Sequence, residues 1–441
     1  MINTAKINIL IILFLTLIAG ISRISADEIS DRGIEWLKSQ IVPNETVKNP
    51  LQQRRRLLLS YRLPESDPAS RFLAGKSFIY DDALAVIAFT MKENYEEAEF
   101  ILSALSRNMK RDGSLWFSYN TNNEWPSEDD SDGAVVRSGA LAWAGYSAVY
   151  YLSVRENEIP DFLETDVIAD EFLQMAEKIA AYLKDRQITD KKDKRYGLIT
   201  GGSGNYELKY NKDKNTVDEV FVRGEIDWVS MEHNIDAFYF FRDLGRLTGN
   251  GEHIDTAALI EKSLMGNMWD RKNSQFFRGI KGDGKEDRAL PLDGASWGSL
   301  FLSSIGESGK AMQSLKMIEK NFRTGDRGFT GYGPYHDELI YENPEASLFL
   351  TGSRDKTWKE AGIVWSEGTL GAAAAYIRAG ETEKGREIII NAGKMAVDGG
   401  LIYSSTGIPF HFSSYPCAAG TAWYIIAQHI LENPDDIFWE K

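Results

Sequence analysis

The stretch VWSEGTLGAAAAYIRAG, residues 364–380, places one acid near the start of an alanine-rich run that is apolar on every side of a helix. Such a helix has no polar face to turn toward water, so it is expected inside a larger helical assembly. Five other segments share this pattern of small and aromatic residues with few charges. The six segments begin near Asp81, Val136, Glu232, Asp293, Glu367 and Pro416.

A second set of segments is charged on one face and apolar on the other, as expected for helices on the outside of a domain. One of them, residues 29–42, precedes the first apolar segment, and the others each follow one. Those others cover residues 95–109, 166–183, 253–268, 309–322 and 381–395. Six inner and six outer helices in alternation predict an all-α fold, an (α/α)6 toroid of helical hairpins closed by the N-terminal helix.

Glycine and aromatic stretches follow the outer segments and predict short strands and turns. They lie at residues 112–117, 196–199, 275–279, 328–332 and 400–403, and each leads into an inner helix. In a toroid of hairpins, all of these connections lie at one end. Loops gathered at one end of a rigid scaffold commonly carry binding and catalysis, so we expect the functional site there.

Acids stand at or just before the start of five of the six predicted inner helices. A carboxylate at a helix N-terminus is often only a cap, and this explanation is available for each acid alone. The toroid would nevertheless bring all the acids around one cavity. Paired carboxyl groups are what glycoside hydrolysis requires, and crowding would raise the pKa of one of them.

Glu232 and Glu367 are the leading catalytic candidates, with Asp82 as a weaker third. We predict Glu232 as general acid, Asp82 or Glu367 as base, and inversion at the anomeric carbon. The expected substrate-binding residues are Tyr80, Asp81, Arg137, Trp228, His233, Asn234, Asp293, Trp297, Trp365 and Tyr415. The aromatic members, together with Trp116, Tyr119 and Trp125, could stack on sugar rings or could simply pack the barrel.

Arg137 lies in an otherwise apolar helix, and a buried guanidinium needs an anionic partner. It could pair with an acid of the ring, such as Asp132, or hold a substrate group. Pairing within the protein is the more economical explanation of the two.

Other motifs are discounted. The glycine-rich residues 201–205 lack the lysine of a phosphate-binding loop. Residues 128–133 resemble the start of a calcium loop, but Gly139 stands where that loop needs a glutamate. The five histidines show no zinc-binding spacing, and Cys417 is more typical of core than of a nucleophile. We therefore expect no metal and no cofactor.

The N-terminus has the order of a secretory signal. Lys6 precedes an apolar run over residues 9–21, and small residues lead to Ala26 before the acidic start at Asp27. The run is too short for a typical bilayer span, although an uncleaved anchor remains the alternative. We predict a signal peptide over residues 1–26, a single toroid over residues 27–441, and a location outside the cell or in its envelope.

The composition limits the partners. The formal charge is −15 for the chain and would become −17 after loss of Lys6 and Arg23 with the signal. An acidic protein repels nucleic acid and anionic membranes. Aromatic residues make up 12% of the chain and include 11 tryptophans. Aromatic loops beside acids suit a neutral sugar, and we expect a carbohydrate substrate and a monomer.

Local patterns of the inner segments resemble those of the six-hairpin glycosidase superfamily. The resemblance covers nearly all of the chain after the signal and rests on five stretches. These are FIYDDALAVIAF (78–89), WVSMEHNIDAFYFF (228–241), LDGASWGSLFL (292–302), VWSEGTLGAAAAYIRAG (364–380) and PCAAGTAWYIIA (416–427). It implies a carbohydrate-active protein of (α/α)6 fold, without placing the chain in one family.

Because this superfamily holds several chemistries, the fold does not determine the reaction. The leading hypothesis is a secreted glycoside hydrolase acting on an oligo- or polysaccharide. A sugar epimerase or polysaccharide lyase with His233, His411 or a tyrosine as base is the second hypothesis. A glycan-binding envelope protein without catalysis is the third.

Overall fold

A computed structural model describes residues 26–42, 56–67, 69–126 and 135–440. The predicted signal peptide over residues 1–26 lies, except for Ala26, outside the described residues. The acidic loop at residues 128–133 is outside them as well.

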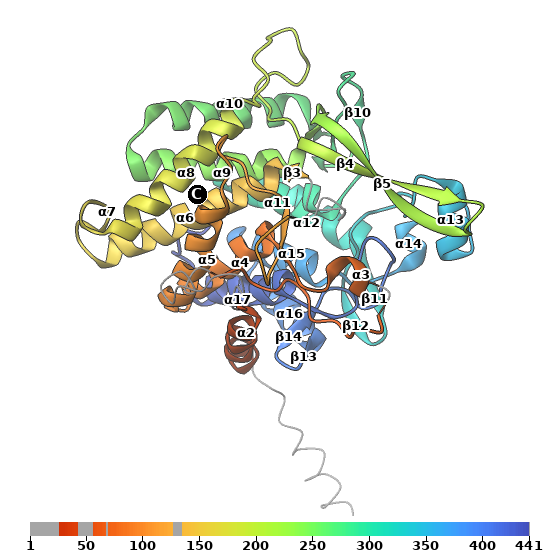
Figure 1. Ribbon diagram of the computed structural model, residues 1–441. Helices are drawn as coiled ribbons and strands as arrows, with labels where there is room; N and C mark the ends of the chain where they lie inside the picture. The colour runs from red at the N-terminus through yellow and green to blue at the C-terminus, as the bar shows by residue number, and fades with distance from the viewer. Residues whose placement is uncertain (1–25, 43–55, 68, 127–134, 441) are drawn as a thin grey trace, which may run out of the picture.

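Six long helices form a closed inner ring. Consecutive members contact one another, and the last contacts the first, so the ring has no open edge (Figure 1). The inner helices are α4 (Ile79–Met91), α6 (Ser138–Glu158), α9 (Met231–Thr248), α11 (Leu292–Ser304), α15 (Ser366–Arg378) and α17 (Ala418–Glu432). Each begins within two residues of its predicted start, so the predicted inner set is confirmed.

An outer helix packs against each inner one. The pairs are α5 (Tyr95–Asn108) on α4, α8 (Val167–Lys184) on α6, α10 (Gly251–Asn267) on α9, α12 (Ser308–Met317) on α11, α16 (Thr382–Ala392) on α15 and α2 (Ala26–Gln40) on α17. The N-terminal helix α2 closes the toroid as predicted. Its Gly33 allows α17 to approach closely, because a side chain there would meet Thr421 at 3.3 Å and Ile425 at 3.4 Å.

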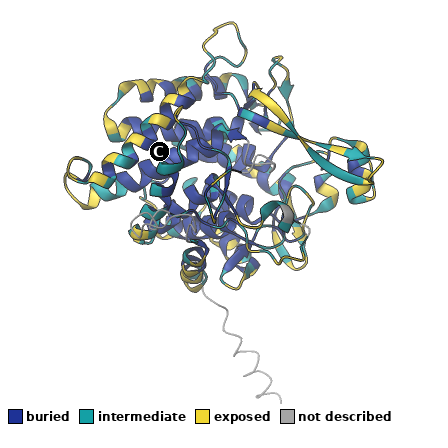
Figure 2. Cartoon of the chain, viewed as in Figure 1, coloured by how far each residue is buried: buried dark blue, intermediate teal, exposed yellow. Residues whose placement is uncertain are grey.

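Burial follows the two sequence patterns. The alanines of α15 from Ala372 to Ala375 have no exposed surface, as expected for a helix without a polar face. The outer helices bury one face and expose the other, which Figure 2 shows as a dark interior with a yellow outer margin. Removing this apolar surface from water is the main stabilising contribution to the toroid.

Short antiparallel sheets connect the helices. Their strands are β1 (Lys76–Phe78), β2 (Ser118–Asn120), β3 (Val136–Arg137), β4 (Gly202–Asn211), β5 (Thr216–Ile226), β6 (Val229–Ser230), β7 (Trp269–Asp270), β8 (Gln275–Phe276), β9 (Gly279–Ile280), β10 (Glu286–Asp287), β11 (Arg323–Asp326), β12 (Phe329–Tyr332), β13 (Ala396–Val397), β14 (Gly400–Ile402) and β15 (Pro416–Cys417). They pair as β1-β2, β3-β4-β5, β6-β9-β10, β7-β8, β11-β12 and β13-β14-β15.

Additional elements extend the loop end of the toroid. The long hairpin β4–β5 reaches across to α13 (Pro344–Thr351), where Tyr210 lies 5.7 Å from Phe349 between ring centroids (Figure 1). The remaining short helices are α3 (Ser70–Leu73), α7 (Phe162–Thr165), α14 (Trp358–Ala361), the π-helical turn Ile318–Phe322 and the 3-10 turn Gly393–Met395.

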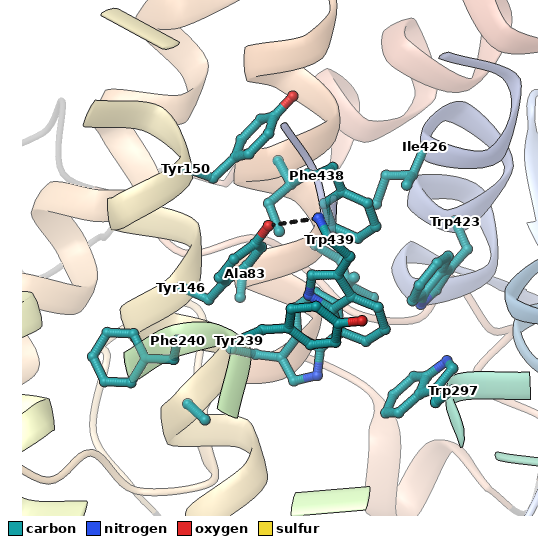
Figure 3. Close-up of a cluster of buried hydrophobic side chains, with 14 of the residues drawn as sticks. Ala83, Tyr146, Tyr150, Tyr239, Phe240, Trp297, Trp423, Ile426, Phe438 and Trp439 are labelled. Atoms are coloured by element: carbon teal, nitrogen blue, oxygen red, sulfur yellow. Dashed lines mark hydrogen bonds between the residues drawn. The ribbon is translucent and has the colours of Figure 1, made fainter. Parts of the chain in front are cut away.

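The C-terminal residues enter the toroid rather than leaving it. Phe438 and Trp439 are 1% and 2% exposed and pack among aromatic side chains of the inner helices (Figure 3). The Trp439 ring stacks on Tyr239 at 4.5 Å with an interplanar angle of 5°. We call residues 437–440 the C-terminal plug.

Among the helices that the structure describes, none is both long and apolar enough to cross a lipid bilayer.

Candidate active site

A cavity of about 350 Å³ opens where the inner helices begin. Phe117 and Tyr403 come from the predicted stretches 112–117 and 400–403, Pro334 and Tyr335 follow the stretch 328–332, and residues near the starts of the inner helices line most of the rest. Its lining comprises Tyr80, Phe117, Arg137, Gly139, Ala140, Trp143, Glu232, His233, Asp236, Asp293, Pro334, Tyr335, Trp365, Glu367, Tyr403 and Phe412. Seven of the thirteen predicted site residues line the cavity: Tyr80, Arg137, Glu232, His233, Asp293, Trp365 and Glu367. An eighth, Asp81, does not line it but raises the pKa of Glu367 through its charge.

Four carboxyl groups from three inner helices face this cavity. Glu232 and Asp236 come from α9, Asp293 from α11 and Glu367 from α15. Glu232 is not needed as a cap, because the Ser230 hydroxyl caps α9 by accepting from the His233 backbone N–H at 3.5 Å. At the start of α15, the N-cap residue is Trp365, and no side-chain hydrogen bond caps the helix there. For Glu232 and Glu367, the capping explanation is therefore not supported.

Crowding and burial favour the protonated forms of these acids. Burial raises the pKa of Glu232 to about 7. Burial, followed by the charges of Asp81 and Glu232, raises the pKa of Glu367 to about 8 against an opposing hydrogen bond from Tyr80. The pKa values of Asp236 and Asp293 are also raised well above the usual range, first by burial and then by neighbouring carboxylates. The cavity can hold protons at neutral pH.

A chain of hydrogen bonds orients Glu367. The Trp423 indole N–H donates to the Tyr80 hydroxyl oxygen at 3.0 Å, and Tyr80 Oη lies 2.6 Å from Glu367 Oε1. An indole can only donate, so the Tyr80 proton is directed to Glu367. Oε1 of Glu367 is consequently an acceptor, which leaves Oε2 to carry a proton.

Several buried polar atoms of the lining have no hydrogen-bond partner within the described chain. They are Trp143 Nε1, His233 Nδ1, Asp236 Oδ1, Asp293 Oδ1 and Trp365 Nε1. An unpaired buried polar atom lowers the stability of the fold. Several such atoms around one cavity therefore indicate a place where a ligand forms hydrogen bonds. The set contains donors and acceptors, which matches hydroxyl groups because each of these can do both.

His233 stands beside Glu232 as a neutral imidazole. Burial and the charge of Arg137 lower its pKa to about 3. Its ring packs against Trp228 at 5.6 Å between centroids. Trp228 is half-buried and does not line the cavity, so it supports His233 instead of contacting ligand directly.

Aromatic rings form one wall. Trp365, Tyr403 and Phe412 pack on one another, with centroid separations of 6.4, 5.7 and 5.2 Å. Such rings offer apolar faces to the C–H groups of a sugar. Tyr403 and Phe412 follow the fifth outer helix, in and after the predicted stretch 400–403, but they are not among the residues that the sequence pattern singles out.

Asp82 does not lie at the cavity, and the prediction that it acts as base is corrected. Its Oδ1 accepts from the Leu58 backbone N–H at 2.9 Å, and its Oδ2 accepts from the Ser77 hydroxyl at 2.6 Å. Both oxygens thus hold the segment before α4 in place. Asp81 is also absent from the lining. Burial raises its pKa to about 7, and it acts on the site through the charge it presents to Glu367.

Three further predicted binding residues have structural contacts instead. Asn234 is fully buried, and its amide bonds the backbone of Ile199 and the carbonyl of Ser230. Trp297 is 3% exposed and packs on Trp143 and Trp423 below the cavity. Tyr415 contributes its carbonyl to the Tyr403 backbone N–H. None of the three lines the cavity.

Arg137 lines the cavity, and its guanidinium donates to the Gly204 carbonyl at 2.7 Å. This contact is with a backbone carbonyl and ties β3 to β4, so the predicted pairing with a ring acid stays a prediction. The suggested partner Asp132 lies outside the described residues. Of the loop aromatics, Tyr119 is buried, Trp116 lies under the Lys110 ammonium at 3.9 Å, and Trp125 is 69% exposed.

Asp236 and Trp143 are cavity residues that the sequence reasoning missed. Asp236 is four positions after Glu232, so both side chains lie on one face of α9. That spacing is a signal present in the sequence. Trp143 gives no comparable signal, because a tryptophan in an apolar helix is ordinary core.

Within the described ranges, no group of three or more potential ligand side chains is placed to hold a metal ion. The acidic loop at 128–133 lies outside those ranges, so the prediction about calcium there stays a prediction.

No protein-family model matches the chain, and no curated protein matches it in sequence. Solved structures do resemble it. A D-mannose isomerase superposes with a TM-score of 0.54 at 12% identity, over 92% of this chain and 97% of that one. A family 76 glycoside hydrolase from a bovine Bacteroides thetaiotaomicron strain gives 0.57 at 11%, over 93% and 78%. The cellobiose 2-epimerase of Bacillus thermoamylovorans B4167 gives 0.54 at 11%, over 92% and 99%.

These similarities confirm the predicted all-α toroid as the fold of the chain. At such identities they do not determine the reaction.

Proposed function

We propose that this protein is an exported glycoside hydrolase that cleaves a neutral oligo- or polysaccharide. The observation that carries the proposal is the convergence of Glu232, Asp236, Asp293 and Glu367 on one aromatic-walled cavity. Two suitably placed carboxyl groups are the minimum for glycosidic cleavage. Unpartnered donors and acceptors in the same lining suit a ligand rich in hydroxyl groups.

The charge of the cavity favours a neutral sugar over an acidic one. Four carboxyl groups line it, and the one lining arginine already donates to a backbone carbonyl. A uronate would add a fifth carboxyl group to these four, and each charge among them raises the pKa values of the others further. A polysaccharide lyase must bind and neutralise such a uronate carboxylate, so lyase action is disfavoured here.

The geometry favours Glu367 as general acid and Glu232 as base, which reverses the roles expected from the sequence. Glu367 has a pKa of about 8 and keeps Oε2 available for the proton, since Oε1 accepts from Tyr80. Glu232 has a pKa of about 7 and is only half-buried, so it can ionise beside entering water.

In the proposed step, Glu367 gives its proton to the glycosidic oxygen as the bond from that oxygen to the anomeric carbon breaks. Glu232 takes a proton from a water molecule whose oxygen forms the new bond to the anomeric carbon. Attack from the opposite face inverts that carbon. Glu232 then returns its proton to solvent and Glu367 regains one.

A panel of neutral and acidic polysaccharides identifies the substrate. New reducing ends without absorbance from a double bond mean hydrolysis, and unsaturated products mean lyase action. Proton NMR of the first product shows the anomer and tests inversion.

Two isosteric variants then test the roles. Glu232→Gln and Glu367→Gln should each lower kcat/KM on the natural glycan by about 10²–10⁴-fold. Glu367→Gln should keep activity on a glycosyl fluoride of the same sugar, because fluoride leaves without protonation. Glu232→Gln should stay inactive on the fluoride until azide is added, and it should then form a glycosyl azide.

Asp82→Asn serves as the control for loss of a nearby acid outside the cavity, with the melting temperature measured in parallel. Full activity of both glutamine variants on the natural glycan would exclude this pair as catalytic. Fluoride activity and azide rescue with the variants exchanged would instead restore the original assignment of roles.

An epimerase is the second candidate, since the neutral imidazole of His233 has an unpartnered Nδ1 in the cavity. His411, the other histidine considered, packs behind the wall with Nε2 at 3.0 Å from the Ile340 carbonyl oxygen. Epimerisation in D2O would place deuterium on the carbon whose configuration changes, without new reducing ends. That result would replace the hydrolase proposal.

A further inference from the structure

We infer that the cavity is blind-ended and that Trp143 and Asp236 at its floor bind the terminal ring of the glycan, so that cleavage proceeds from a chain end. This inference rests on the proposed hydrolase function and adds the mode of attack to it. Three features carry it: a closed floor, an unpaired acceptor at that floor, and a small cavity lined from several loops.

The C-terminal plug closes the floor. Trp143 lines the cavity, and its ring lies 5.0 Å from that of Trp439 on the other side. The Trp439 backbone N–H donates to the Tyr146 hydroxyl at 3.1 Å, one turn along α6 from Trp143 (Figure 3). The central channel of the toroid is therefore filled directly beneath the cavity.

Two arginines of inner helices hold the plug: Arg378 at the end of α15 and Arg242 in the second half of α9. Arg378 donates to the carbonyls of Pro434, Asp436 and Phe438 at 2.7, 2.8 and 2.6 Å. Arg242 donates to the Glu440 carbonyl at 2.9 Å. Charged donors on backbone carbonyls give strong hydrogen bonds, so the floor is a fixed part of the fold.

Asp236 offers an unpaired acceptor at this floor, beside the weakly bonded indole N–H of Trp143. Asp236 is 3% exposed and lies one helical turn below Glu232, and its Oδ1 has no partner. Burial raises the pKa of Asp236, and a weak side-chain hydrogen bond from the Trp143 indole opposes this rise, although Nε1 lacks the distance and angle of a full hydrogen bond. A sugar hydroxyl, or two neighbouring ones, can pair with both atoms.

The cavity is small in relation to a glycan chain, with a volume of about 350 Å³. Phe117, Tyr335 and Phe412 come from three different loops around the rim. A ring that reaches Asp236 places its far hydroxyls against the floor, with no space for a further glycosidic bond there. The scissile bond then lies toward the opening, one turn above, where Glu232 and Glu367 are.

The product pattern on the substrate found by the panel tests this mode of attack. The polysaccharide is labelled at its reducing end, and products are followed from the first few per cent of cleavage. A single small product should accumulate from the start while viscosity falls slowly. An early ladder of intermediate lengths with a steep loss of viscosity would overturn the inference and leave the hydrolase proposal intact.

Binding of the released sugar tests the floor residues separately from catalysis. Titration calorimetry with the small product should show binding that Asp236→Asn and Trp143→Phe each weaken by about tenfold or more. Asp255→Asn, an exposed acid on α10, is the matched control and should bind as the parent does. Unchanged affinity in both floor variants would overturn the assignment.

Forms of the small product that each lack one hydroxyl group distinguish a lost contact from a misfolded variant. The parent should lose about tenfold in affinity for the form that lacks the hydroxyl bound by Asp236, whereas Asp236→Asn should lose no more. If the affinity loss from Asp236→Asn and the loss from removing the hydroxyl group multiplied when combined, Asp236 would be excluded as the partner of that hydroxyl. If no glycan of the panel is hydrolysed, both the proposed function and this inference fail.

Discussion

At the scale of single residues, the proton on Glu367 depends on a phenol. Tyr80 donates to Glu367 Oε1, and this bond opposes the burial that raises the carboxyl pKa to about 8. The proposed acid must be protonated, so activity should fall as pH rises through about 8. The proposed base must be ionised, so activity should fall as pH drops through about 7. A maximum between these values follows.

Tyr80→Phe should move the alkaline limb of the kcat/KM profile upward. The variant removes a hydrogen bond to the carboxylate, so the pKa of Glu367 rises while that of Glu232 stays. Tyr376→Phe is the control. Tyr376 lies on α15, the helix that carries Glu367, but its hydroxyl donates to the Leu315 carbonyl and not to Glu367. Kinetics from pH 5 to 10 measure both limbs. An alkaline limb that stays or moves down in Tyr80→Phe would contradict the proposed bond as the cause.

The contrast between Asp82 and Asp236 shows what the sequence can tell at this scale. A pair of acids at a helix start predicts that one faces the cavity, but the partners of Asp82 come from the loop at Leu58 and from Ser77, which no local pattern connects to it. Asp236 carries the periodic signal from Glu232. Its depth in the cavity depends on the packing of α6, which is a tertiary property.

At the scale of elements, α6 and α9 meet closely at Gly139. A Cβ there would lie 2.5 Å from His233 Cδ2 and 3.0 Å from Asp236 Oδ2. Glycine is thus required by the close approach of two helices that carry the site.

Gly139→Ala should therefore displace His233 and Asp236. We expect a loss of about 1–3 kcal/mol in the free energy of unfolding and a fall in kcat/KM. Gly266→Ala on α10 is the control, since no atom lies within 4 Å of its Cβ position and alanine favours the helix. Denaturant unfolding and glycan kinetics measure both effects. Parent-like stability and activity in Gly139→Ala would show that the helices can separate at no cost.

The helices were predictable and the loop insertions were not. Apolar and amphipathic periods place twelve helices within a few residues, because each period reflects which face is buried. The β4–β5 hairpin carries an alternating signal in Tyr206, Leu208 and Tyr210, but the glycine-rich residues 201–205 before it obscure the strand. Its contact with α13 joins segments more than 130 residues apart, which local patterns do not encode.

At the scale of the whole molecule, the toroid combines a plugged lower end with an acidic upper end. The plug was not predicted, because Phe438 and Trp439 in a short tail show no period. Its place follows from the aromatic interior that the inner helices leave open. The acidic end has the opposite effect on stability, since burying several carboxyl groups together opposes folding whenever they ionise.

Stability should therefore fall as pH rises across neutrality. Glu367 ionises near 4.5 in the unfolded chain but near 8 in the folded one. The folded state thus binds more protons in between, and the stability present below about pH 4.5 is lost progressively up to about pH 8. Glu367→Gln cannot ionise, so its advantage over the parent should grow from less than about 1 kcal/mol at pH 5 to about 2–4 kcal/mol at pH 8.5.

Urea unfolding of parent and variant at matched pH values measures this difference. Glu360→Gln is a control of opposite sign, because hydrogen bonds from Thr357 lower the pKa of that exposed carboxyl and its loss brings no gain at high pH. A difference between Glu367→Gln and the parent that is constant with pH would mean that Glu367 titrates alike in both states. The same glutamine variant should be the more stable and the less active, since the carboxyl that destabilises the fold is the one that the proposed reaction needs.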